Sequence, residues 1–204
     1  MYKKLVETIN GITNVDAISE ERKTVLQPLI GFVQQKAEVG EDINLNFICT
    51  HNSRRSHLAQ VWAQMASAYF NIPNVRCYSG GTEETTLFPK VAETLIEQGF
   101  DIFKVAETDN PIYAIKYSEN ALPVIGFSKR HDHPYNPLSA FAAVMTCSQA
   151  DRDCPFIVGA ERRISVPYDD PKISDGTPGQ SQIYAERSLQ IATEMCYVFS
   201  RVKN

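Results

Sequence analysis

The sequence predicts an α/β fold: a parallel sheet of about four strands with helices on both faces, to which N-terminal helices and an inserted β-hairpin are added. Short apolar segments typical of strands alternate along the chain with longer segments in which apolar residues recur at helical spacing. This alternation begins near residue 41 and is interrupted once. We therefore expect a helical extension over residues 1–40 and an α/β domain over 41–204, with an insertion at about 104–140.

The composition is that of an ordinary globular protein. Of the 204 residues, 43% are hydrophobic and 22% are charged, and no apolar run approaches the ~20 residues that cross a bilayer. A net charge of -4 gives no general attraction for nucleic acid, so an anion must be captured by a local site. The five cysteines are odd in number and widely spaced, which indicates reactive thiols. Because Glu7 argues against a signal peptide, we expect a cytoplasmic protein without membrane or nucleic-acid partners.

Residues 1–40 are expected to be helical. Ser19 can cap a helix that Pro28 either kinks or restarts and that Gly40 ends. The apolar stripe of this helix consists of Val25, Leu26, Leu29, Ile30 and Val33. The segment has no ionisable cluster, so we expect extra helices that pack on the core or on a second subunit, which would make the protein a homodimer.

The α/β domain opens with a strand over residues 44–48, where polar and apolar side chains alternate. From 58 to 69 the apolar residues fall on one helical face. A second short strand over 75–78 is followed by two glycines that allow close backbone approach, and a helix runs from 89 to 99.

The segment 111–128 interrupts the alternation of strands and helices. Two apolar stretches flank residues 118–120, which predicts a β-hairpin. The loop after it contains His131 and His133, which could form a metal pair. Without a third placed ligand they are better interpreted as solvated loop residues, so we predict no metal and no cofactor.

The rest of the chain supplies two more strands, an apolar run over 141–145 and a short one over 164–166. A polar loop rich in glycine and proline leads from there to a last helix over about 181–201. Parallel strands covered by helices place a ligand at their C-terminal ends.

Seven residues that begin with Cys49 and end with Arg55 lie between the first strand and its helix. A loop wrapped around a tetrahedral oxyanion points its backbone N–H groups inward, and the following helix adds the positive end of its dipole. A thiol there lies in a field that favours the nucleophilic thiolate, and the Arg55 fork can hold two oxygens of the anion. The expected oxyanion-binding residues are Thr50, His51, Asn52, Ser53, Arg54, Arg55 and Ser56. The alternative is a buried cysteine at a strand end followed by two solvent-facing arginines.

Cys147 and Cys154 form a second thiol pair, at the end of a strand and in a polar loop that is flexible enough for the two thiols to meet. Zinc is the rival interpretation, but the chain lacks a second placed pair of ligands. Asp170, which precedes Pro171, supplies a carboxylate that can protonate a departing oxygen, although an Asp-Asp-Pro sequence alone would indicate a turn. Cys77 and Cys196 lie in apolar surroundings and are expected in the core.

These residues together resemble the low-molecular-weight protein tyrosine phosphatase superfamily and, within it, the thioredoxin-coupled arsenate reductases. The resemblance covers roughly residues 43–103 and 141–203. It is carried by the Cys-x5-Arg-Ser loop, the Ser-Gly-Gly segment that begins at Ser79 and the Asp170-Pro171 pair, which both branches share. The pair of Cys147 and Cys154 resembles the reductase branch specifically.

The resemblance implies a mechanism. The Cys49 thiolate attacks arsenic, Arg55 and backbone amides hold the oxygens, and Asp170 protonates the leaving oxygen. Cys147 then attacks the sulfur of the adduct, arsenite leaves, and Cys154 moves the disulfide to the pair that a thioredoxin-like reductant can reach. Arsenate or phosphate is thus the implied oxyanion.

Two positions of the loop depart from the family pattern. His51 replaces the usual glycine, where it would crowd the backbone, and Arg54 replaces a second cysteine, where it would strengthen anion binding or face solvent. Lys172 stands where the tyrosine phosphatases carry aromatic residues. The alternative function is a low-molecular-weight protein tyrosine phosphatase that hydrolyses phosphomonoesters through a Cys49 phosphoenzyme. A third is a non-catalytic oxyanion-binding or redox-sensing protein.

Overall fold

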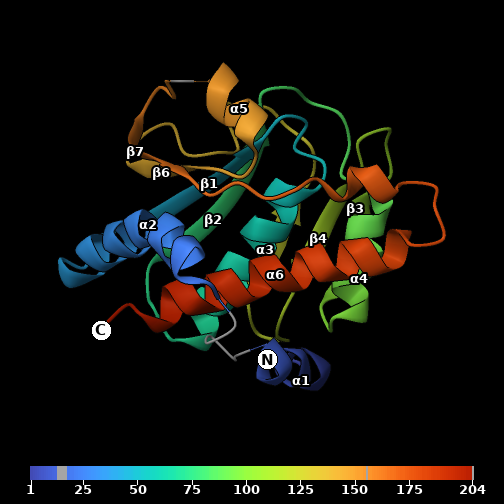
Figure 1. Cartoon of the computed structure of the whole chain (residues 1–204), viewed down its shortest axis with the longest axis horizontal. Helices are drawn as coiled ribbons and strands as arrows, with labels where there is room; N and C mark the ends of the chain where they lie inside the picture. Colours follow the sequence, from blue (N-terminus) through green and yellow to red (C-terminus); the bar gives the residue numbers. More distant parts are fainter. Residues whose placement is uncertain (13–17, 155, 204) are drawn as a thin grey trace.

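The computed structural model describes residues 1–12, 18–154 and 156–203 and is built around a four-stranded parallel sheet (Figure 1). The strand order is β2-β1-β6-β7. The strands are β1 (Ile43–Cys49), β2 (Val75–Gly81), β6 (Phe141–Met145) and β7 (Ala160–Ser165). Every neighbouring pair in this sheet is parallel, so the predicted four-stranded parallel sheet is confirmed.

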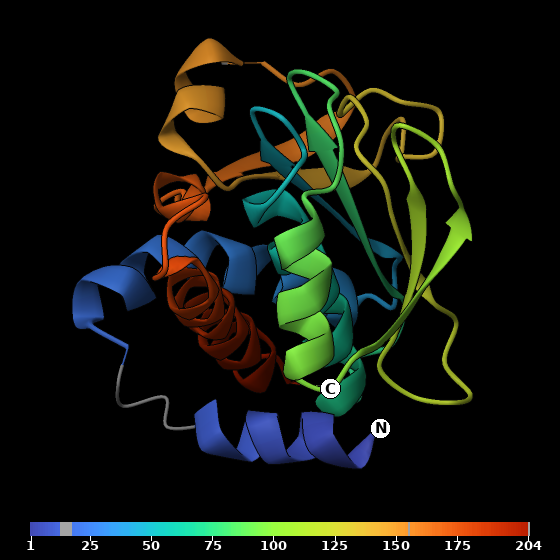
Figure 2. The ribbon, with the colours of Figure 1, turned by 90° about the vertical axis from the view of Figure 1, so that its right-hand side faces the viewer.

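One face of the sheet carries the main helical layer, in which α3, α4 and α6 lie together (Figure 2). The helices of the chain are α1 (Lys3–Ile12), α2 (Glu20–Glu38), α3 (Arg55–Tyr69), α4 (Pro89–Glu97), α5 (Ser148–Asp153) and α6 (Gln180–Ser200). Because side chains alternate along a strand, Leu45 and Phe47 of β1 enter the main core on this face, whereas Ile48 faces the other way.

The opposite face has a thinner cover. Alternate residues of β6 form a small apolar cluster with residues of α5 and of the segment after it, which includes Ile48, Phe141, Ala143, Met145, Ala150 and Ile157. The buried Asn46 of β1 donates a hydrogen bond from Nδ2 to the backbone oxygen of His131, which ties the segment after β5 to this face. Loops and the short helix α5 therefore cover this face of the sheet.

The N-terminal helices pack on the same chain. Ser19 caps α2 as predicted, accepting a hydrogen bond from the backbone nitrogen of Arg22, and α2 continues through Pro28 without a break. Leu5 of α1 is fully buried against the core, and Gly99 permits this because a Cβ there would collide with the backbone of Leu5. The expected packing of the extension on the core is thus the arrangement that the structure shows.

A second, antiparallel sheet has the order β3-β4-β5. Its strands β4 (Ile112–Lys116) and β5 (Val124–Gly126) are the predicted hairpin. The strand β3 (Asp101–Ala106) was not predicted, because it is largely exposed and its large side chains Phe103 and Val105 are 50% and 61% exposed. Without a buried face, its sequence carries no alternating pattern.

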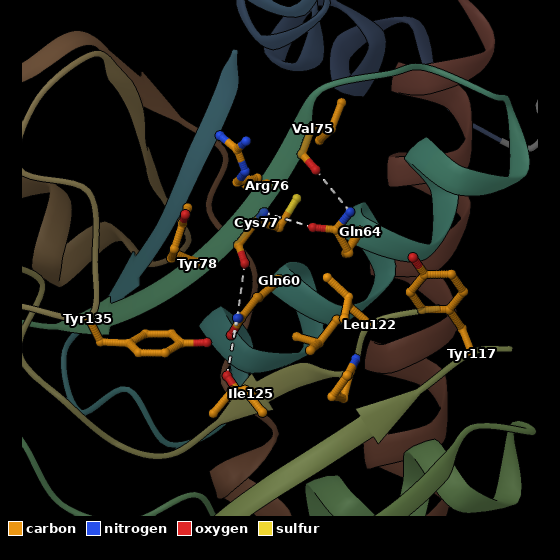
Figure 3. Close-up of a pocket in the computed structure, with 12 residues that line it drawn as sticks. Gln60, Gln64, Val75, Arg76, Cys77, Tyr78, Tyr117, Leu122, Ile125 and Tyr135 are labelled. Atoms are coloured by element: carbon orange, nitrogen blue, oxygen red, sulfur yellow. Dashed lines mark hydrogen bonds between the residues drawn. The ribbon is translucent and has the colours of Figure 1, made fainter. Parts of the chain in front are cut away.

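Side chains of α3 cover the outer edge of strand β2 (Figure 3). Gln64 accepts a hydrogen bond from the backbone nitrogen of Cys77 and donates one to the oxygen of Val75. Gln60 donates to the backbone oxygens of Cys77 and Ile125, so its amide joins the facing edges of the two sheets. These amides replace a neighbouring strand, and the edge opens beside them into a cavity of about 450 Å³.

No helix among the described residues is long and apolar enough to cross a membrane.

We predict that Gln64→Ala lowers the free energy of unfolding by about 1–3 kcal/mol, because two backbone groups at the edge of β2 lose their partners. The measurement is urea denaturation followed by circular dichroism. Gln182→Ala is the matched control, since Gln182 bonds only the exposed Glu186 one helical turn away. Equal stability of the two variants would contradict the role of Gln64 as an edge cover.

Candidate active site

Three predicted elements meet at the C-terminal edge of the parallel sheet. Cys49 is the last residue of β1, and Cys147 follows the end of β6, the strand directly beside it. The segment after β7 brings Asp170 to the same edge. Parallel neighbours end on one side of a sheet, so positions about 100 residues apart in the chain become neighbours in space.

The loop after Cys49 is curled, and its backbone oxygens are held from outside. The carbonyl groups of Thr50, His51 and Ser53 accept hydrogen bonds from the segment 82–88. Among the described residues, the N–H groups of 51–54 donate to no other backbone group outside helices and strands. The first turn of α3 receives no side-chain cap from Arg54. With the oxygens turned outward, the N–H groups are left to bind an anion.

Gly81 lets this loop lie against β2. A Cβ at Gly81 would come within 2.7 Å of the backbone oxygen of Thr50 and 2.8 Å of the nitrogen of Asn52. Asn52 adopts a left-handed conformation with φ of 43°, whereas His51 is not among the residues with positive φ. The backbone conformation of His51 therefore does not itself require a glycine. The second glycine of the Ser-Gly-Gly segment serves close approach, as its sequence suggested.

The hydrogen bonds around Cys49 have a defined direction. Asn52 donates from Nδ2 to Oγ of Ser56 at 2.9 Å, and Oγ of Ser56 lies 3.1 Å from Sγ of Cys49. Because Ser56 accepts from the amide, its own proton is free to point at the sulfur. Asn52 is fixed in turn by Lys129, whose backbone nitrogen donates to Oδ1. The chain of contacts thus ends on Sγ of Cys49, to which the hydroxyl of Ser56 can donate.

Arg55 does not bind within the loop in this structure. Its Nη2 donates to Oδ2 of Asp170 at 2.5 Å and its Nη1 to the backbone oxygen of Tyr168 at 3.0 Å. The cavity lined by Cys49, Arg55 and Asp170 holds only about 10 Å³, which is close to the space of one water molecule. In this structure the guanidinium of Arg55 is therefore taken up by Asp170, and little space remains between them and Cys49.

Arg54 is engaged elsewhere. Its guanidinium donates to the hydroxyl of Tyr184 and to the carboxylate of Asp175, both at 2.6 Å, and lies over the ring of Phe88 at 4.1 Å. It does not face solvent, since only 12% of its side chain is exposed. His51 lies beside Glu83, with Nε2 3.4 Å from the carboxylate.

Cys147 and Cys154 stand at the two ends of α5. Cys147 is buried and caps the helix, accepting a hydrogen bond from the nitrogen of Ala150 at 3.3 Å, and its Sγ lies 3.5 Å from Oγ1 of Thr50. Cys154 is partly exposed at the C-terminal end. The prediction of a polar loop between them is wrong, because six residues form a helix here that the thiol of Cys147 itself caps.

Two buried basic residues beneath the loop had no signal in the sequence. Burial lowers the pKa of Lys129 to about 7, and its Nζ lies over the rings of Phe127 and Tyr135. Burial and the nearby Lys129 lower the pKa of His57 to about 3, and its Nδ1 lies 3.2 Å from Oγ of Ser79. Lys129 supports the loop from a segment that is distant in sequence. His57 supports it from the position directly after Ser56, the last residue of the Cys-x5-Arg-Ser motif.

The remaining cysteines lie in the core, as predicted. Cys77 and Cys196 are buried, and burial raises the pKa of both thiols. Within the described residues, no group of three histidine, cysteine or acidic side chains is placed to hold a metal ion.

Comparison with known proteins agrees with this geometry. No family model matches the chain. An arsenate reductase of Staphylococcus aureus is 31% identical over 151 residues, which cover 72% of this chain and 91% of the relative. Arsenate reductase 2 of Staphylococcus epidermidis is 30% identical over 125 residues, or 61% of this chain and 76% of the relative. The chain belongs to the arsenate reductase family.

The fold of this family member is that of the low-molecular-weight protein tyrosine phosphatases. A solved phosphatase of this kind from Vibrio cholerae superposes with a TM-score of 0.50 at 14% identity, covering 77% of this chain and 94% of the phosphatase. The resemblance inferred from the Cys-x5-Arg loop is thereby confirmed: the relatives are arsenate reductases, which are enzymes, and the fold is that of the low-molecular-weight phosphatases.

We predict that stability falls on acidification because of His57. Its pKa is lower in the folded state, about 3, than the ordinary value of 6.5, so the unfolded chain binds the additional proton. This contribution is complete above pH 6.5 and is lost as the pH falls toward 3. Between pH 7 and pH 5 it amounts to about 2 kcal/mol. Urea denaturation at several pH values measures this slope, and a slope that persists unchanged in His57→Gln would contradict its assignment to His57.

Proposed function

We propose that the protein reduces arsenate to arsenite through the Cys49 thiolate and a disulfide relay of Cys147 and Cys154. The observation that carries the proposal is the placement of two thiols at neighbouring strand ends: Thr50, which follows Cys49 directly, contacts Sγ of Cys147 at 3.5 Å. This arrangement would let one sulfur attack an adduct formed on the other. Membership of the arsenate reductase family supports the substrate.

In the first step the Cys49 thiolate attacks arsenic, an S–As bond forms, and one As–O bond breaks. The departing oxygen takes a proton from Asp170 and leaves as water. The backbone N–H groups of residues 51–55 and the guanidinium of Arg55 hold the remaining oxygens. For this purpose Arg55 exchanges the carboxylate of Asp170 for the oxyanion. The freed carboxylate takes up a proton from solvent and then passes this proton to the departing oxygen.

In the second step the thiol of Cys147, as thiolate, attacks Sγ of Cys49. An S–S bond forms, the electron pair of the S–As bond passes to arsenic, and As(V) becomes As(III), which leaves as arsenite. Cys154 then attacks Cys147, which transfers the disulfide and releases Cys49. A thioredoxin-like reductant, which we propose as the partner in the cytoplasm, reduces the disulfide of Cys147 and Cys154, of which Cys154 is partly exposed in the reduced protein.

The last exchange requires α5 to unwind. Seven positions along a helix span roughly 10 Å, whereas the Cα atoms of a disulfide lie within about 7 Å. Cys147 and Cys154 delimit α5 at its two ends, so they cannot bond while it persists. We propose that oxidation of this pair melts the helix and exposes the disulfide to the reductant.

The second candidate is hydrolysis of phosphomonoesters. The small cavity lined by Cys49, Arg55 and Asp170 contains the groups that a phosphatase of this fold would use, and it supports phosphate as well as arsenate. In that case water would cleave the Cys49 phosphoenzyme, and neither Cys147 nor Cys154 would take part.

We predict that Cys147→Ser abolishes steady-state arsenate reduction with a thioredoxin-coupled assay, while Cys154→Ser permits about one turnover per protein molecule, because the Cys49–Cys147 disulfide then has no resolving thiol. Cys77→Ala, which removes a buried thiol outside the site, is the matched control and should retain activity. Unchanged arsenate reduction in both serine variants would refute the relay. If aryl phosphate hydrolysis were the only activity and survived both changes, the second candidate would replace the first.

We also predict that α5 loses structure on oxidation. Hydrogen exchange measured by mass spectrometry should show the amides of residues 148–153 protected in the reduced protein and exchanging at least tenfold faster when Cys147 and Cys154 are bonded. Cys49→Ser isolates this pair from the nucleophile. Equal protection in the two redox states would contradict the helix unwinding.

A further inference from the structure

The guanidinium of Arg54 makes hydrogen bonds and a ring contact near the candidate active site. Its Cζ lies 4.1 Å from the centre of the Phe88 ring, it donates from Nε to Tyr184 and from Nη2 to Asp175, and its side chain is 12% exposed. Because charge-assisted hydrogen bonds that are shielded from water are stronger than exposed ones, this group is fixed in place. It therefore connects the anion-binding loop rigidly to whatever holds its partners.

Asp175 gathers the contacts of three residues. Besides Arg54, its carboxylate accepts hydrogen bonds from the hydroxyl of Tyr184 at 2.6 Å and from Nε2 of Gln180 at 3.2 Å. Tyr184 belongs to α6 and is fully buried. The pKa of Tyr184 is raised by burial and by Asp175, so its hydroxyl stays protonated and can donate. Asp175 is thus held between the anion-binding loop and α6.

A short, compact segment joins Asp175 to Asp170. Residues Pro171–Ser174 form one turn of 3-10 helix, whose first backbone donor, that of Lys172, bonds the carboxylate of Asp170. The nitrogen of Asp175 in turn donates to the backbone oxygen of Lys172. Since the segment is bonded internally at both ends, a displacement of Asp175 is transmitted to Asp170.

We propose that Arg54 is a positioning residue, which acts through Asp175 to hold the segment that carries Asp170 over the mouth of the loop. The two adjacent arginines then have separate tasks. Arg55 must release Asp170 when the oxyanion enters. Arg54 instead stays bonded to Asp175, so that the freed carboxylate of Asp170 remains near the departing oxygen. This inference rests on the proposed function, in which Asp170 donates the proton.

A positioning role of Arg54 and direct anion binding by Arg54 predict different effects on kcat and KM. If Arg54 held the oxyanion in ground state and transition state alike, its loss would raise KM and leave kcat nearly unchanged. If it positions the acid, its loss lowers kcat, and it does so only as long as Asp170 is present. A misplacement of about 1 Å can lower a rate by 10²-fold.

The experiment combines kinetics of arsenate reduction with hydrogen exchange in Arg54→Ala, Asp175→Asn, Asp170→Asn and the double variant of Arg54→Ala with Asp170→Asn. Arg54→Ala and Asp175→Asn should each lower kcat by about 10- to 100-fold with KM changed less than about threefold. The double variant should be no slower than Asp170→Asn alone. Amides of residues 172–177 should exchange faster in Arg54→Ala and in Asp175→Asn, while those of the main sheet remain protected.

Arg187→Gln is the matched control. It removes the ion pair that Arg187 makes at 3.1 Å with Asp169, whose side chain is 92% exposed, on the same segment but outside the loop. This variant should retain kcat and the exchange pattern. Arg54→Lys, which keeps the charge but loses the fork, should recover only part of the rate.

The outcomes distinguish the positioning role of Arg54 from the role of Asp170 as the acid. A raised KM with unchanged kcat in Arg54→Ala, unchanged exchange over 172–177, or additive losses in the double variant would overturn the role of Arg54 while leaving Asp170 as the acid. An Asp170→Asn variant as fast as the unmodified protein would instead overturn the proposed role of Asp170. Should Arg54→Ala fail to fold, Asp175→Asn and Tyr184→Phe give the same readings.

Discussion

The outward attachment of the loop carbonyl groups is the constraint on which the rest of the site depends. Segment 82–88 and Ser128 donate hydrogen bonds to the backbone oxygens of residues 49–51 and 53, and Gly81 allows the loop to approach closely enough for these bonds to form. In the proposed mechanism the N–H groups of the loop and the dipole of α3 then act together on an anion beside Cys49. The parallel sheet contributes by ending β1 and β6 side by side, which brings Cys147 within reach.

The anion site is closed by a competition between carboxylate and oxyanion. Asp170 occupies the fork of Arg55, and the space that remains is about 10 Å³. In the proposed mechanism a bound oxyanion replaces the carboxylate of Asp170 at the fork, so substrate binding and the release of Asp170 are coupled through one guanidinium. In our account the same segment stays attached through Asp175, which limits how far the released carboxylate can move.

The sequence was sufficient for the strand-loop-helix around Cys49 because its signals are local: alternation in β1, a change to helical spacing in α3 and the Cys-x5-Arg spacing between them. It was insufficient where the structure of a segment depends on residues that are distant in the sequence. The helix α5 depends on a thiol cap and on packing against β6, β3 lies exposed with no alternating pattern, and the burial of Lys129 follows from rings that fold over it. Likewise the position of the Arg54 guanidinium depends on its hydrogen bond to Asp175, which is 121 residues away in the sequence.

The central claim is that Cys147 attacks the sulfur of the Cys49 adduct, which releases arsenite and leaves a disulfide between the two cysteines. Mass-spectrometric mapping of disulfides in Cys154→Ser, after reaction with one equivalent of arsenate and quenching with an alkylating agent, tests it most directly. The account predicts a single disulfide between Cys49 and Cys147, formed in proportion to the arsenite released. Release of arsenite with both of these cysteines recovered as alkylated thiols would contradict it.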